Sequence, residues 1–75
     1  ENQMEEFMFL GLRMTAGVRR SEFAKRFGMS MNEVYGEKIE HFVREKLLTN
    51  SGDRVFLTER GMDLANRVMA GFLLD

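Results

Sequence analysis

Cysteine is absent from this chain of 75 residues. Without thiols, neither a disulfide nor a thiolate metal site can reinforce the core, which at this size buries only about 60% of the unfolded surface. The absence also fits a reducing compartment. The chain opens with ENQMEEF, which is acidic where a secretion signal is basic. We therefore expect a cytoplasmic protein.

Long apolar runs and a strong net charge are missing as well. No stretch approaches the roughly 20 apolar residues that cross a bilayer, so we expect no membrane span. The formal net charge of −1 gives no overall attraction to nucleic acid or to anionic membranes. The chain does contain seven Phe and seven Met, and the packing of such side chains must hold together one domain over residues 1–75.

Helix signals dominate the first third of the chain. Apolar residues at helical spacing predict a first helix that stops near 15–17, where Gly17 suits a left-handed cap. Ser21 is placed to cap a short helix over 22–27, and Gly28 is placed to end it.

A third helix is expected to begin after Ser30 or Asn32 and to run to about Lys46. Its glutamates share one side, which indicates a solvated face. The opposite, apolar side is expected to be buried, and it is formed by Tyr35, Ile39, Phe42 and Val43.

The last third of the chain predicts a β-hairpin and a final helix. A turn at 51–53 separates two short extended arms, 48–50 and 54–57. Thr58 is placed to cap the helix that follows, in the phrase L-T-x-x-G. The expected core stripe of this helix is Gly61, Leu64, Ala65, Val68 and Phe72.

The predicted order is therefore helix, short helix, helix, hairpin, helix. This fold class is mainly α with a small β-hairpin, and the order is that of a winged-helix-like domain with the hairpin as its wing. The alternative is an irregular small helical bundle that carries a hairpin.

The first helix is apolar on more than one side. Helical spacing places Phe7, Leu10 and Met14 together, and we expect this side to face the domain's own core. Other apolar residues of the first and last helices fall outside the core stripes, and large exposed apolar patches usually mark a partner surface. The predicted docking surface is Met8, Phe9, Leu12, Met62, Met69 and Leu73.

No catalytic, cofactor-binding or metal-binding constellation is apparent. His41 is the only histidine, and no cysteine is present to share a metal with it, so a structural or surface role is favoured over haem ligation. The glycines form no phosphate-binding G-x-G-x-x-G or P-loop. Gly11 and Gly36 lie inside predicted helices, where close helix–helix approach is the ordinary explanation.

A winged helix raises the question of DNA binding. Affinity for DNA requires cations on the recognition helix and the wing. Residues 33–46 instead carry four glutamates against three basic residues, so we expect no nucleic-acid partner. Basic residues gather earlier in the chain, either as a solvated edge or as an edge that docks an anionic partner: Arg13, Arg19, Arg20, Lys25 and Arg26.

Several phrases of the sequence resemble one family over nearly the whole chain. They are FMFLGLRMTAGV, VYGEKIEHFVREKLL and LTERGMDLANRVM. The chain resembles the C-terminal domain of the oxygen-independent coproporphyrinogen III oxidase family, and in particular its oxidase-like, haem-chaperone branch. The first and third phrases are fairly specific, whereas the hairpin is generic.

The resemblance implies a role and a set of absences. In that family this domain follows a radical-SAM barrel that carries the C-x-x-x-C-x-x-C cluster motif and the S-adenosylmethionine site. The resemblance therefore implies a 4Fe-4S cluster, S-adenosylmethionine and, in the chaperone branch, haem for the parent protein, and none of these for this chain, which has no cysteine.

The expected role is that of a non-catalytic domain, cut from a longer porphyrin-pathway protein, that packs against the barrel. Excision would leave its apolar patch bare and open to self-association. The alternative function is a winged-helix nucleic-acid-binding or protein-interaction module of a regulator.

Overall fold

The computed structural model describes residues 2–73, and it confirms the predicted order of elements, with one strand added and the final helix divided in two. The helices and strands are α1 (Asn2–Leu12), β1 (Val18–Arg19), α2 (Arg20–Phe27), α3 (Met31–Arg44), β2 (Leu48–Ser51), β3 (Arg54–Leu57), α4 (Glu59–Asp63) and α5 (Ala65–Gly71).

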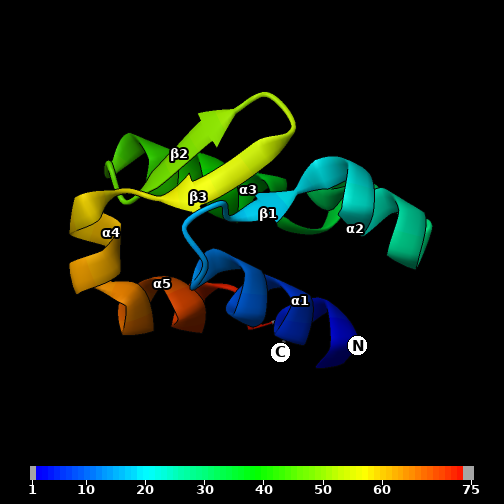
Figure 1. Cartoon of the computed structure of the whole chain (residues 1–75), viewed down its shortest axis with the longest axis horizontal. Coiled ribbons are helices and arrows are strands. Elements are labelled where there is room, and N and C mark those ends of the chain that lie inside the picture. The colour runs from blue at the N-terminus through cyan, green and yellow to red at the C-terminus, as the bar shows by residue number, and fades with distance from the viewer. Residues whose placement is uncertain (1, 74–75) are drawn as a thin grey trace.

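The hairpin is part of a three-stranded antiparallel sheet with the strand order β1-β3-β2 (Figure 1). Strand β1 is only two residues long and was not predicted, because so short a segment carries no periodicity. It pairs Val18 with Val55 and Arg19 with Arg54. The central strand β3 is therefore bonded on both sides, and the loop after α1 is tied to the wing.

Local capping signals set most of the helix boundaries. Ser30 begins α3 with a capping box, in which its Oγ accepts from Glu33 N and its own backbone N donates to the Glu33 carboxylate. Thr58 caps α4 by accepting from Gly61 N. Gly28 ends α2 at a positive φ of 72°. These predictions are confirmed.

The start of α2 differs from the prediction. The helix begins at Arg20, and Arg19 occupies the cap position without a side-chain cap bond. Ser21 therefore lies in the first turn and is not the N-cap. Its backbone N and its Oγ both donate to the carboxylate of Asp53, in the hairpin turn. A residue 32 positions away thus supplies the acceptor that the local sequence was expected to supply.

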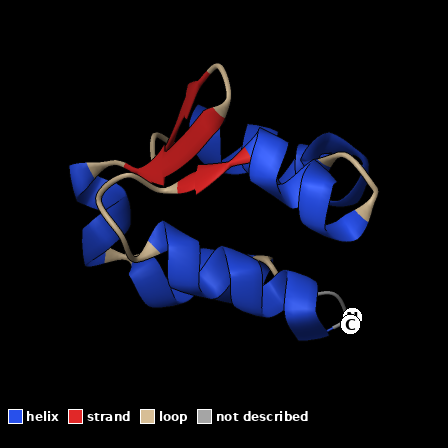
Figure 2. Cartoon of the chain, turned by 45° about the vertical axis from the view of Figure 1, so that its right-hand side comes forward, coloured by secondary structure: helices blue, strands red, loops and turns tan. Residues whose placement is uncertain are grey.

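An aromatic cluster from the helices forms part of the core. Figure 2 shows the three strands of the sheet on one side of the domain, with helices on the other. The ring of Phe23 lies 5.6 Å from that of Phe7 and 6.2 Å from that of Tyr35. Tyr35 in turn lies 5.1 Å from Phe72, whose ring also contacts Phe42 at 5.9 Å. These ring contacts join α1, α2, α3 and the end of α5 into one apolar unit.

The buried side of α1 differs from the predicted one. Met8 and Leu12 are completely buried, whereas Leu10 and Met14 are 60% and 63% exposed. The cause is the approach of β1: a Cβ at Gly11 would overlap the Val18 side chain, so this glycine faces the sheet and rotates the helix about it. Of the side predicted to face the core, only Phe7 packs against it.

The final helix is interrupted, which the sequence did not predict. It breaks at Leu64, whose φ of −112° and ψ of 31° are not helical, and the chain continues as α5 in a new direction. The break turns Met69 into the core, where it is 7% exposed. Val68 and Phe72 of the predicted stripe are buried as expected, and Leu64 and Ala65 are half-buried.

Candidate functional site

The predicted docking surface does not exist as one patch. Three of its six residues, Met8, Leu12 and Met69, belong to the domain's own core, so they cannot also contact a partner in this fold. Phe9 is half-buried and packs against that core. Only Met62 and Leu73 are exposed, at 48% and 51%.

The exposed apolar surface of α1 instead borders a shallow groove, named here the α1 groove. It holds about 260 Å³. Its walls come from the second half of α1, the loop into β1 and the outer side of α2: Phe7, Leu10, Gly11, Met14, Gly17, Val18, Glu22 and Arg26. Leu10 and Met14 were missed as surface residues because helical spacing fits either side of this helix. Gly11 was the one signal in the sequence that could have oriented it.

Arg26 connects the α1 groove to the basic residues of the sequence. Its guanidinium carbon lies 5.3 Å from the ring centre of Phe27 and 6.0 Å from that of Phe7. Such stacking holds a cation over an aromatic face while leaving its hydrogen-bond donors available. The groove is therefore lined mostly by apolar residues and also by two charged residues of α2, Arg26 and, one helical turn before it, Glu22.

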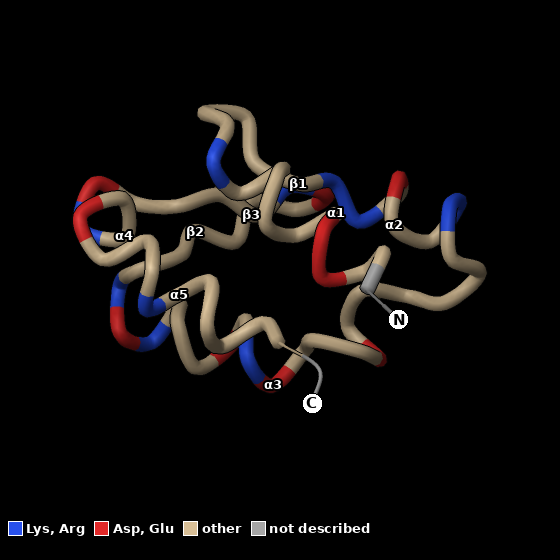
Figure 3. Tube along the Cα trace, turned by 90° about the horizontal axis from the view of Figure 1, so that it is seen from below, with Lys and Arg blue, Asp and Glu red and all other residues tan. Residues whose placement is uncertain are grey.

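The predicted basic edge is divided in the structure. Arg13 follows α1, Arg19 lies in β1, and Lys25 and Arg26 lie in the last turn of α2, where cations complement the helix dipole. These four side chains are exposed, whereas Arg20 is half-buried. Figure 3 shows acidic positions interspersed with basic ones along the whole trace. The basic residues therefore come from the end of α1, from β1 and from α2.

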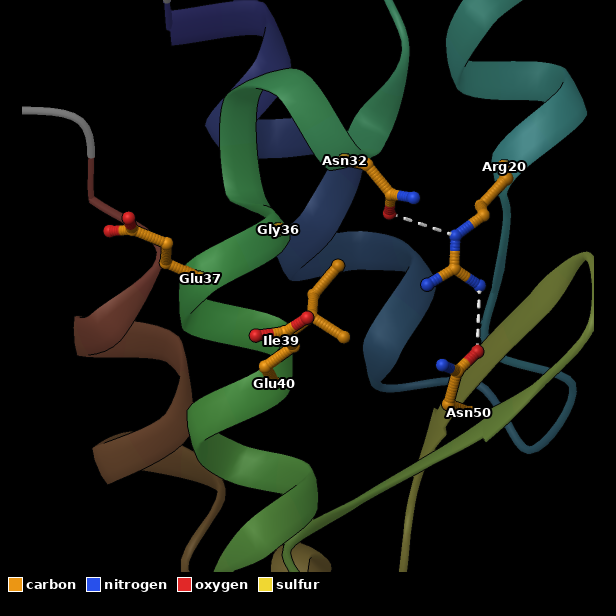
Figure 4. Close-up of a pocket in the computed structure, with 7 residues that line it drawn as sticks. All are labelled: Arg20, Asn32, Gly36, Glu37, Ile39, Glu40 and Asn50. Atoms are coloured by element: carbon orange, nitrogen blue, oxygen red, sulfur yellow. Dashed lines mark hydrogen bonds between the residues drawn. The ribbon is translucent and has the colours of Figure 1, made fainter.

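Arg20 is held by three neutral acceptors. Its Nε donates to Asn32 Oδ1 at 3.2 Å, and its Nη1 donates to Asn50 Oδ1 at 2.9 Å and to the carbonyl oxygen of Gly52 at 2.8 Å. The guanidinium thus bridges α2, α3 and the hairpin (Figure 4). Beside it lies a hollow of about 300 Å³, named here the Arg20 pocket, lined by Arg20, Asn32, Gly36, Glu37, Ile39, Glu40 and Asn50.

The other candidate chemistry of the sequence leads to no site. The side chain of His41 is 52% exposed, and its Nε2 lies 3.6 Å from a Glu45 carboxylate oxygen. Within residues 2–73, no group of three His, Cys, Asp or Glu side chains is arranged to hold a metal ion. None of the helices in that part of the chain combines the length and the apolarity that crossing a bilayer requires.

Comparisons with known proteins agree on one family. The family model described as "HemN C-terminal domain" matches residues 1–64. A "Heme chaperone HemW" from Lactococcus lactis subsp. lactis (strain IL1403) is 43% identical over 75 residues, which is 100% of this chain and 20% of that protein. A "Heme chaperone HemW" from Bacillus subtilis (strain 168) is 41% identical over 73 residues, which is 97% of this chain and 19% of that protein. No solved structure matches the chain significantly.

Proposed function

This chain belongs to the HemN C-terminal domain family, and from that membership we propose that it serves a haem chaperone as a non-catalytic domain that docks on the rest of its own protein. The chain spans about a fifth of the length of the curated relatives it matches. We propose that a cytoplasmic parent supplies the remaining four fifths. The names of both relatives favour a chaperone over an oxidase.

The observation that carries the docking proposal is the α1 groove. Leu10 and Met14 are large apolar side chains, more than half exposed, on a wall of this groove. Burying one such side chain contributes about 1.5–3 kcal/mol. A tethered domain needs only a modest interface, because the tether keeps its effective concentration near the millimolar range. Burial of these two side chains would therefore contribute to the docked state, together with the other contacts of the interface.

The residues of this chain do not fit the parent's cofactors. The chain has no cysteine, so it offers no thiolate to an iron–sulfur cluster. The side chain of His41 is 52% exposed, beside Phe42 and 3.6 Å from a Glu45 carboxylate oxygen. We therefore assign the chain no step of the parent's chemistry.

The docking proposal is tested in the longer parent protein. Leu10→Ser and Met14→Ser should leave this domain folded and should speed limited proteolysis in the segment that precedes it. The matched control is Met29→Ser, another exposed methionine, which lies between α2 and α3 and outside the groove. Equal proteolysis of the parent and all three variants would show that the α1 groove is not the docking surface. A groove that instead captures a separate protein would favour the alternative, a protein-interaction module.

A further inference from the structure

The Arg20 pocket contains a glycine that packing does not explain. Gly36 lies in the interior of the 14-residue helix α3, where glycine costs roughly 1 kcal/mol relative to alanine. A Cβ built there would meet only Asn32 Cβ, at an ordinary 3.7 Å. The expectation of close helix–helix approach is therefore wrong for Gly36, although an equivalent close approach does occur at Gly11, against β1. What Gly36 provides is empty space beside the guanidinium of Arg20.

The charge of Arg20 is not neutralised. All three groups that it binds are neutral oxygens, and it forms no ion pair within the described residues. The carboxylate of Asp53 lies near enough for Arg20 to help lower its pKa, but it is engaged by Ser21. Arg20 is thus a fixed cation whose geometry is set before any ligand arrives, which reduces the entropy lost on binding.

Three donor groups around the hollow are unused. Arg20 Nη2 makes no hydrogen bond within residues 2–73, and Figure 4 shows it directed into the space between α3 and the hairpin. The amide oxygens of Asn32 and Asn50 both accept from Arg20, which leaves the NH₂ ends of both side chains without an acceptor in the same part of the chain. A planar guanidinium beside amide donors is suited to a carboxylate.

The far wall of the pocket has the opposite sign. Glu37 and Glu40 both line it from α3. Figure 4 shows the Glu40 carboxylate in front of that helix beside Ile39, whereas the Glu37 carboxylate points away from Arg20. A ligand with a carboxylate alone would meet both repulsion and attraction. A ligand that also carries a cationic group some carbons away would place each charge next to its opposite.

We propose that the Arg20 pocket binds a zwitterion, with a carboxylate at Arg20, Asn32 and Asn50 and an amine at Glu40. The ligand is of amino-acid size, as the volume of about 300 Å³ allows. This site lies on α3 and the hairpin and not on the α1 groove, so the proposal does not depend on docking.

The test compares three small probes of similar length on the 75-residue chain: γ-aminobutyrate, butyrate and butylamine. The readout is the NMR shift of Arg20 Nε–H and of the side-chain NH₂ groups of Asn32 and Asn50. γ-Aminobutyrate should bind with a dissociation constant on the order of 1 mM. Butyrate and butylamine should bind several-fold more weakly. Absent shifts, or equal affinities for all three probes, would overturn the proposal.

Variants assign the contacts. Arg20→Gln should weaken γ-aminobutyrate binding at least about tenfold, because a hydrogen bond to a charged group is lost. Lys25→Gln, which removes an exposed cation at the other end of α2, should not. Glu40→Gln should reduce the ratio of the affinity for γ-aminobutyrate to the affinity for butyrate, because it removes the carboxylate that the amine contacts. Gly36→Leu should abolish binding, because the larger side chain fills the hollow. Gly36→Ala is the control, because one methyl group leaves most of the hollow open and should leave binding largely intact. Unchanged binding in both Arg20→Gln and Gly36→Leu would refute the site.

Two kinds of ligand could present a carboxylate and an amine to the pocket. One is a free small molecule, and the other is a pair of side chains, one acidic and one basic, of the longer parent protein. Repeating the titration with γ-aminobutyrate on the parent separates them. Shifts that persist in the parent assign the pocket to a small molecule. Shifts seen with the 75-residue chain and lost in the parent assign it to the parent's own side chains.

Discussion

The carboxylate of Asp53, in the hairpin turn, accepts hydrogen bonds from both the backbone N and the Oγ of Ser21, at 2.8 and 2.7 Å. Arg20 N also donates to the carbonyl oxygen of Asp53. An aspartate near the first turn of a helix satisfies donors that the helix leaves unpaired and complements its dipole. Asp53 therefore caps α2 from the hairpin and holds the wing against the helix.

Replacing Asp53 by Asn should destabilise the domain in a pH-dependent way. The hydrogen bonds from Ser21, first from its side chain and then from its backbone, lower the pKa of Asp53 below its usual range. A lowered folded-state pKa contributes stability above the ordinary pKa and loses it as pH falls through the folded value. Urea unfolding of the unsubstituted 75-residue chain and of Asp53→Asn gives the free energy of unfolding of each. The difference between the two free energies should shrink from about pH 7 to about pH 3. Asp63→Asn, at the end of α4, is the control. A difference that stays constant with pH would contradict the capping role.

Met8 and Leu10 form a direct test of which side of α1 is buried. Met8→Ala should lower the free energy of unfolding by about 2–5 kcal/mol, because it opens a cavity in the core. Leu10→Ala should change it by no more than about 0.5 kcal/mol, since the side chain is mostly in solvent. Denaturant titrations of the two variants give their free energies of unfolding. If Leu10→Ala were the more destabilising variant, Leu10 would face the core, as the sequence predicted.

Two helix glycines should respond in opposite directions to alanine. A Cβ at Gly61 would overlap the carbonyl oxygen of Leu47 and lie 3.1 Å from Leu57 Cδ2, so Gly61→Ala should cost about 1–3 kcal/mol. Gly36 faces open space, and Gly36→Ala should add up to about 1 kcal/mol through helix propensity. Thermal unfolding of both variants gives the signs. Loss of stability in Gly36→Ala would mean that the hollow beside Arg20 does not tolerate even one methyl group.

Tyr35 carries a buried hydroxyl that has no hydrogen-bond partner within the described residues. Tyr35→Phe removes this unpaired group and keeps the ring contacts with Phe23 and Phe72, so stability should change by less than about 1 kcal/mol. Burial, and secondarily the charge of Glu5, raises the pKa of Tyr35 to about 12. Because the pKa of Tyr35 is raised in the folded state, ionisation of its hydroxyl destabilises the fold. Between about pH 10 and about pH 12, Tyr35→Phe should therefore become more stable relative to the unsubstituted 75-residue chain. A loss of several kcal/mol at neutral pH would reveal a hydroxyl partner.

The domain should not bind duplex DNA specifically. The exposed side of α3 carries Glu33, Glu37 and Glu40, and the hairpin turn carries Asp53 beside Arg54. Recognition helices and wings neutralise phosphates, which these carboxylates would repel. A gel-shift assay at near-physiological salt should show no sequence-dependent complex. Sub-micromolar, sequence-dependent binding would contradict this prediction and would favour a regulator module.

Local signals in the sequence predicted several of the helix boundaries correctly. The capping box at Ser30, the cap at Thr58 and the stop at Gly28 each involve residues within four positions of one another. Such short-range hydrogen bonds depend little on the rest of the fold, so they can be predicted from the sequence alone. The family resemblance, which the comparisons confirm, rests on the same linear information.

The two candidate sites could not be predicted in the same way. The Arg20 pocket joins residues of α2, α3 and the hairpin that are 12 and 30 positions apart in the sequence. Arg20 was expected to belong to a basic edge, because its neighbours in the chain are basic. Its acceptors, Asn32 and Asn50, carry no charge and no spacing that marks them as partners.

The sequence by itself determined the order of the helices and the hairpin, the caps at Ser30, Thr58 and Gly28, and the family to which the chain belongs. Only the tertiary structure decided which residues of α1 are core and which are surface. This helix is apolar on more than one side, so its periodicity allows several orientations of nearly equal burial. The choice was made by Val18 of β1, which packs against Gly11 and turns Met8 and Leu12 inward and Leu10 outward. Burial is a property of what lies opposite a side chain, and for α1 the opposing surface comes from strands that pair over long range.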